Sequence, residues 1–184
     1  MNSTKIAVSV GAALLLQLLI ARYLRFEHFD LNYLDLVLIM TVYTSFGRNP
    51  KRTIWVAAGS GLVQDSFSGG LLGTQSFTKT VIGYGASLLS EHLALDHMIP
   101  RLMVMGAAAL VNGLLFIGLH ALFGVRLLVQ PVGEHLVHYL GWYLAANVMG
   151  AAVGFHLLDL IMEERPSRPT RLWARGYRRR RPRL

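Results

Sequence analysis

The segment from Gly59 to Gly73 carries the polar residues of this chain that are best placed to do chemistry. It reads GSGLVQDSFSGGLLG and sets Gln64 and Asp65 beside a glycine-rich turn between two apolar runs. An ionisable side chain at such a depth is costly, so it is a candidate functional site by default. Two roles are open to this carboxylate. It can accept hydrogen bonds from the backbone amides of the Ser68-Gly69-Gly70 turn, or it can bind a ligand or partner while charged.

Lys79 lies about one turn into the next apolar run, close enough to the turn to pair with Asp65. A buried ion pair is weak evidence for stability, but a buried charge left alone is costly. We therefore favour a structural role for the pair over a ligand site. The candidate structural or partner-interface residues are Gln64, Asp65, Ser68, Gly69, Gly70, Gly73 and Lys79.

The remaining charged groups suggest simpler roles. Asp35 stands near the end of an apolar run, where we expect it to reach water. His156 and Asp159 share one helical face, and an interfacial pair is favoured there over a proton relay. The chain has no nucleophile elbow, phosphate loop or HExxH motif, and no cofactor or metal site is predicted. An enzyme is therefore the minority hypothesis.

Composition places these residues in a helical membrane protein. Of the 184 residues, 53% are hydrophobic and 15% are charged, whereas a soluble domain has about 25% charged residues. The apolar residues gather into six runs, which predict an all-α polytopic fold with six transmembrane helices over residues 1–162. The predicted runs are Ile6–Ala21, Leu34–Phe46, Ile54–Phe67, Gln75–Leu89, Leu102–Phe123 and Leu136–Met162. The second run is short for a full span and is consistent with a partly re-entrant helix.

Lysine and arginine set the expected orientation, because these residues accumulate on the cytoplasmic side of membrane proteins. With six spans and both ends in the cytoplasm, 14 basic residues lie inside and 3 lie outside. The inner group includes nine arginines after Met162. Residues 163–184 form a basic tail, which we expect to be disordered or bound to the membrane surface. Anionic lipid is favoured over nucleic acid as its partner, through Arg171, Arg175, Arg178, Arg179, Arg180 and Arg181.

Small residues indicate where helices approach closely, because packing in lipid relies on them. Ala146, Gly150 and Gly154 form a continuous small-residue groove along the last predicted helix. Packing within the chain is the favoured role of such grooves. The alternative is that one of them receives a helix from another protein.

The segment from Leu34 to Gly73, which spans the second and third runs and the turn that follows, resembles the rod shape-determining protein MreD family of bacteria. The resemblance rests on an apolar span, the basic turn Arg48-Asn49-Pro50, and the stretch from Gly61 to Gly73. In that stretch Gln64, Asp65, Gly69, Gly70 and Gly73 fall on the family pattern, whereas Leu71 and Leu72 stand where a proline is common.

This resemblance implies a non-enzymatic scaffold of the cell-elongation machinery in the cytoplasmic membrane. It implies MreC as the direct partner, and MreB, RodA and a class B penicillin-binding protein as partners within the complex that directs lateral peptidoglycan synthesis. The family's fold is similar to the substrate-binding component of energy-coupling-factor transporters. That similarity raises capture of a vitamin-type molecule as an alternative function, although no convergent polar pocket is evident from the outer loops.

Overall fold

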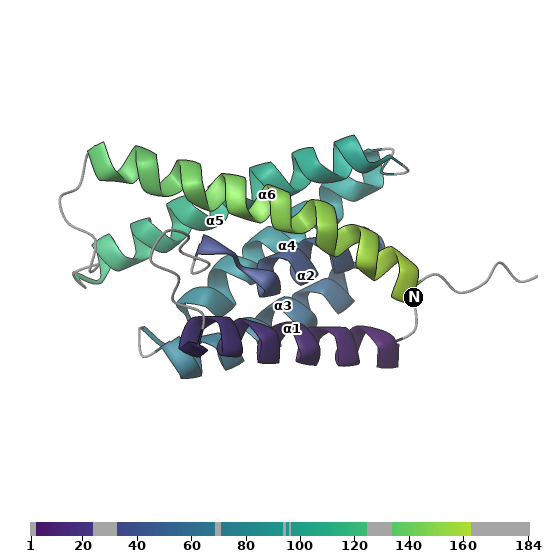
Figure 1. Ribbon diagram of the computed structural model, residues 1–184, viewed down its shortest axis with the longest axis horizontal. Coiled ribbons are helices and arrows are strands. Elements are labelled where there is room, and N and C mark those ends of the chain that lie inside the picture. Colours follow the sequence, from purple (N-terminus) through teal and green to yellow (C-terminus); the bar gives the residue numbers. More distant parts are fainter. Residues whose placement is uncertain are drawn as a thin grey trace, which may run out of the picture.

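The computed structural model describes residues 3–23, 33–68, 71–93, 95, 97–124 and 134–162. These residues form six helices and contain no strand, which confirms the all-α prediction, and each predicted run corresponds to one helix. In chain order the helices are α1 (Ser3–Tyr23), α2 (Leu36–Ser45), α3 (Pro50–Ser68), α4 (Thr74–His92), α5 (Met98–Leu122) and α6 (Glu134–Met162) (Figure 1).

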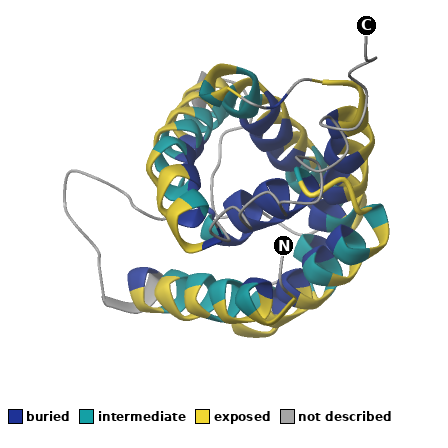
Figure 2. Ribbon diagram, turned by 90° about the vertical axis from the view of Figure 1, so that its right-hand side faces the viewer, coloured by how far each residue is buried: buried dark blue, intermediate teal, exposed yellow. Residues whose placement is uncertain are grey.

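Three of these helices, α1, α5 and α6, are long and apolar enough to cross a membrane. Large apolar side chains point outward from several helices, among them Leu15, Trp55, Leu114 and Val153. Buried turns gather toward the middle of the molecule and exposed turns lie on the outside (Figure 2). An outer surface of this composition suits hydrocarbon better than water, as expected for a membrane protein.

The short helix α2 is the centre of the bundle. Nine of its ten residues are buried, and it contacts each of the other five helices. Ten residues of α-helix measure roughly 15 Å, about half the thickness of a bilayer's hydrocarbon core. A helix of this length, enclosed on all sides, begins within the bundle rather than at its surface.

The chain that leads into α2 is extended, and two carboxamide side chains bind its backbone. From α1, Gln17 donates to the carbonyl of Leu34 at 2.9 Å and accepts from the amide of Leu36 at 2.8 Å. From α6, Asn147 accepts from the amide of Asp35 at 3.0 Å and donates to the carbonyl of Tyr33 at 2.8 Å. Non-helical backbone is tolerated at membrane depth only when protein groups satisfy it in this way.

Helices α3 and α4 form a tight antiparallel pair. A Cβ atom added at Gly61 would lie 2.5 Å from the Cα atom of Ser76, so only glycine allows the two backbones to come this close. The hydroxyl of Ser76 donates to the carbonyl of Ala58 at 2.9 Å across the same contact. These two contacts fix the register in which α3 packs against α4.

One end of the bundle gathers the start of α1, the end of α6 and several basic residues. The ammonium group of Lys5 donates to the carbonyl of Ile161 at 3.0 Å, and Arg48 donates to the carbonyl of Ser90 at 3.1 Å. These contacts place the N-terminal end of α1, the α2–α3 turn and the C-terminal ends of α4 and α6 together (Figure 1).

Asp159 at this end does not form the predicted pair with His156. Its carboxylate binds Arg101 of α5 at 2.7 Å and accepts from the hydroxyl of Tyr43 at 2.9 Å, whereas the side chain of His156 is exposed. Two residues on one helical face point in similar directions, and here the carboxylate reaches inward to a neighbouring helix.

The small-residue groove on α6 is occupied by the chain itself. Gly150 packs against Leu34 and Ile39, and Gly154 packs against Ile39, while Ala146 is half-buried on the same helix. This arrangement corresponds to the favoured packing within the chain and leaves no room there for a partner helix. The basic tail, with its six named arginines, lies outside the described residues.

Candidate functional site

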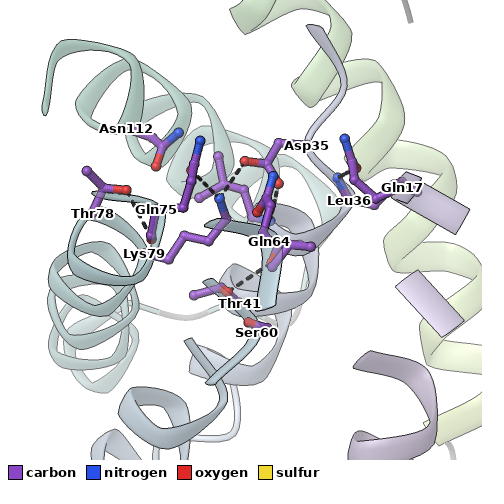
Figure 3. Close-up of polar contacts among 12 residues, drawn as sticks. Gln17, Asp35, Leu36, Thr41, Ser60, Gln64, Gln75, Thr78, Lys79 and Asn112 are labelled. Carbon is purple, nitrogen blue, oxygen red and sulfur yellow. Dashed lines mark hydrogen bonds and ion pairs between the residues drawn. The ribbon is translucent and has the colours of Figure 1, made fainter. Parts of the chain in front are cut away.

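A buried ion pair joins the N-terminal end of α2 to α4. Lys79 is fully buried, and its ammonium nitrogen lies 2.8 Å from Oδ2 of Asp35. The same nitrogen donates to Oε1 of Gln75 at 2.6 Å, one turn earlier on α4. Figure 3 shows the side chains of Asp35, Gln75 and Lys79 turned toward one another.

The second oxygen of Asp35 caps α2. Its Oδ1 atom accepts from the amide of Leu38 at 2.9 Å, which satisfies one of the free amides at the start of the helix. A helix N-terminus carries partial positive charge, so the carboxylate interacts favourably with α2 and with Lys79 at once. One acidic side chain therefore stabilises both the start of a helix and the only lysine buried among the described residues.

Two sequence predictions about these charges are wrong. Lys79 pairs with Asp35 rather than with Asp65, and Asp35 does not reach water, because it is only 6% exposed. Both errors have one cause. The second apolar run begins at Leu34, but its helix starts inside the bundle, so the residue that precedes the helix is enclosed instead of lying at the surface.

Asp65 holds the start of α4 from the last turns of α3. Its Oδ2 atom accepts from the amides of Gly73 and Ser76 at 2.9 and 3.1 Å, and Oδ1 accepts from the amide of Gln75 at 3.0 Å. The carboxylate is 5% exposed. The N-cap residue of α4 is Gly73, which has no side chain to accept from the free amides at the start of the helix. Asp65, which lies eight residues earlier on α3, supplies the acceptors instead.

Among the described residues, Asp65 binds amides that lie further along the chain than the expected turn. We expected the amides of Ser68, Gly69 and Gly70, whereas the described partners lie at Gly73 and beyond; Gly69 and Gly70 lie outside the described residues. Ser68 is exposed, and its hydroxyl donates to the carbonyl of Gln64. Gly73 adopts a φ of 96°, which lies in the left-handed region that favours glycine.

Sequence reasoning missed the amides that complete this site. Gln17, Asn112 and Asn147 each stand alone within an apolar run, and Gln75 opens another; all four bond to other groups of the bundle. Isolated carboxamides in membrane helices tend to bond across helices, and that was the available signal. The partners of Gln17, Asn112 and Asn147 outside their own helices could not be predicted, because they lie 17 or more positions away in the sequence.

A comparison with known families identifies the group to which this chain belongs. The model for the rod shape-determining protein MreD matches residues 3–158. The chain belongs to the MreD family. No curated protein and no solved structure matches it, so the likeness to a transporter component stays a prediction. The match spans the MreD helices and both buried carboxylates but ends before the basic tail.

The ion pair gives the first test of this geometry. Asp35→Asn keeps an acceptor for the Leu38 amide but leaves Lys79 unpaired, and Lys79→Met leaves the carboxylate unpaired. Each substitution should lower the unfolding free energy by about 3–5 kcal/mol, because a lone buried charge remains. The double variant should lose less than the sum of the two single losses. Chemical unfolding of the purified protein in lipid nanodiscs measures all three.

The control for this cycle is the half-exposed pair at the other end of the bundle. Arg101→Met breaks a contact whose two side chains are 22% and 39% exposed, so it should cost about 1 kcal/mol or less. If the two single variants at Asp35 and Lys79 behave like this control, the ion pair does not stabilise the bundle.

The Asp65 contacts predict a graded response. Asp65→Leu removes the acceptors for three amides and should cost about 1–3 kcal/mol for each group left unpaired. Asp65→Asn keeps one acceptor oxygen and should be intermediate. Size-exclusion profiles report folded yield, and hydrogen exchange at Gln75 and Ser76 reports the amides themselves. Ser66→Ala, which removes an exposed hydroxyl nearby, should leave both unchanged. Equal damage from Asn and Leu would mean that the charge is required rather than the hydrogen bonds.

Proposed function

We propose that this protein is a non-enzymatic integral scaffold of the bacterial elongation complex, which helps to direct lateral peptidoglycan synthesis and rod shape. The family match over residues 3–158 is the observation that carries this proposal. The interior is consistent with it, because Asp35, Asp65 and Lys79 bond to groups that hold helices in place. MreC is the direct partner in this proposal, and RodA, MreB and a class B penicillin-binding protein act through the complex.

The proposed location is the cytoplasmic membrane, with several spans and both termini in the cytoplasm. The 14-to-3 distribution of basic residues supports this orientation. So does the gathering of Lys5, Arg48 and Arg101 at the end of the bundle where α6 also ends.

Fusion reporters test the orientation. A reporter that is active only outside the membrane should be inactive when fused after Leu184, and a reporter that is active only in the cytoplasm should be active there. The opposite pair of results would reverse the proposed topology. Fusion of the same two reporters after Phe123, in the α5–α6 connection, is the internal control and should give the reversed pattern.

The surface proposed for the MreC helix is a groove between α1 and α3. Its volume is about 630 Å³, and its walls are almost entirely apolar. It follows α1 from Ser3 to Leu14 and α3 from Arg52 to Val63, which corresponds to roughly 16 Å along each helix. A groove that follows two helices for three turns has the shape needed to hold a third.

Two glycines in this groove supply the argument for a helix as its occupant. A Cβ atom added at Gly11 or Gly59 would meet nothing within 4 Å, so neither glycine is required by packing within the chain. Glycine destabilises a helix interior by about 0.5–1 kcal/mol relative to alanine. In a membrane it also lets a partner backbone approach closely. The exposed ring of Trp55 forms one edge of the same groove.

Co-purification tests the groove. Gly11→Leu and Gly59→Leu should fold normally, since both added side chains have space, but they should reduce recovery of this protein with affinity-tagged MreC to background. Gly118→Leu and Gly141→Leu are matched controls, because these helical glycines also face open space and lie outside the groove. They should leave recovery unchanged.

Cell shape gives the second measurement on the same four variants. In rod-shaped cells without their own MreD protein, the two groove variants should fail to restore rods, whereas the two controls should restore them. Normal MreC recovery with both groove variants would place the contact on another surface. Rod growth with no MreC contact at all would overturn the scaffold mechanism.

A further inference from the structure

A polar cavity lies among the six helical segments, beside the ion pair. Its volume is about 250 Å³, and its lining includes Gln17, Asp35, Gln64, Gln75, Asn112 and Tyr143. One water molecule needs only about 10–15 Å³ of such space. The cavity is therefore large enough for a small organic molecule, and every helix or its entry segment contributes to the wall.

Two buried acceptors in this wall have no partner in the described part of the chain. They are Oε1 of Gln64 and Oδ1 of Asn112. Asn112 is only 3% exposed, and its amide nitrogen is already used, because it donates to the hydroxyl of Tyr143 at 2.7 Å. Buried polar atoms in folded proteins almost always have partners, so two free acceptors on one cavity call for an occupant.

Three other carboxamide side chains of the interior differ from Gln64 and Asn112, because their oxygen atoms have hydrogen-bond partners. Gln17 and Asn147 each bond to the backbone before α2 through both ends of the amide, and the oxygen of Gln75 accepts from Lys79. These three hold the fold together. Gln64 and Asn112 also line the cavity, but each keeps a buried oxygen without a partner among the described residues; Figure 3 shows the two side chains on either side of Gln75.

The charge and chemistry of the wall define the class of ligand. Among the described residues that line the cavity, Asp35 alone is charged, and Lys79 already neutralises it, so an ion would find no opposite charge among them. A hydroxyl group both donates and accepts, and so it matches a carboxamide in either orientation. The rings of Tyr139 and Tyr143 stack 6.1 Å apart on one side of the cavity and offer an apolar face to a carbon skeleton.

We propose that this cavity binds a small uncharged molecule with several hydroxyl groups. The hydroxyl groups donate to Gln64 and Asn112, and the carbon skeleton packs against the tyrosine rings. A free sugar or polyol has this chemistry, and so does the sugar headgroup of a neutral glycolipid. The proposal does not depend on the scaffold role, because the cavity and the groove proposed for MreC share no lining residue.

The test uses the full-length protein in nanodiscs. Mass spectrometry of a solvent extract should detect a retained neutral, hydroxylated molecule. Equilibrium binding should then be measured with tritiated glucose as the free probe and with vesicles containing monoglucosyl diacylglycerol as the lipid probe. Vesicles of the same bilayer lipid that contain diacylglycerol in place of the glycolipid are the control for the lipid tail.

Substitutions locate the binding. Asn112→Leu and Gln64→Leu each remove a free acceptor, so each should weaken binding or retention at least tenfold while the protein stays folded. Ser87→Ala is the matched control, because Ser87 also has a buried oxygen without a partner but does not line the cavity. Its binding should equal that of the unmodified protein.

Each outcome decides the proposal. Binding of glucose identifies a free solute, and binding of the glycolipid alone identifies a headgroup. Absence of both, together with an extract that contains no neutral hydroxylated molecule, would overturn it. So would retention of a charged molecule that an extract of empty nanodiscs lacks, or equal binding by the Leu variants and the unmodified protein. Recovery of MreC is a separate measurement, so failure here leaves the scaffold proposal standing.

Discussion

A helix that begins inside an apolar bundle leaves its first amides, and the chain before it, without access to water. The position of α2 makes this constraint decisive for the whole protein. Gln17 and Asn147 bind the extended chain, and Asp35 caps the helix at the amide of Leu38. The cap brings a negative charge into the interior, and Lys79 offsets it. Four side chains from three other helices and the entry segment thus fix one short central helix.

These bonds supply what apolar packing in a membrane does not. Helices surrounded by hydrocarbon gain little from the hydrophobic effect when they meet, because lipid tails are as apolar as leucine. Apolar residues of the same volume could fill the space around Asp35 and Lys79, often at no loss of stability. They would not fix the depth or rotation of a ten-residue helix, whereas directional bonds to named backbone groups do. The polar side chains in the interior of this protein are therefore best explained as groups that hold the helices in one particular arrangement.

The sequence was sufficient for the features that depend on local pattern. Six apolar runs predicted six helices, and the short second run indicated that α2 would be unusual. The Gln64-Asp65 motif directed attention to the α3–α4 connection, where a carboxylate does bind the start of a helix. Even so, whether six segments cross the membrane depends on more than apolar runs, since only three of the helices are long and apolar enough to do so alone.

Features that depend on distant residues could not be predicted. The partner of Lys79 lies 44 positions away, on a segment whose own pattern suggested exposure. The spacing of Gly150 and Gly154 predicted a groove but not its occupants. Leu34 and Ile39 of the same chain fill it. The cavity is the clearest case. Its wall combines one to three residues from each helix or, for α2, from the segment before it, so the outer loops gave no sign of a convergent polar pocket.

Helix α3 links the two surfaces to which function is assigned. Val63 lines the groove shared with α1, and the next residue, Gln64, lines the polar cavity on the other side. Asp65 then binds the start of α4, and α4 contributes Gln75 to the wall of the same cavity. A partner helix that shifted α3 would therefore move a wall of the cavity and the anchor of α4 together. Gly61 lets α3 and the start of α4 pack backbone against backbone, so one tightly packed pair of helices joins the groove proposed for a partner helix to the polar cavity.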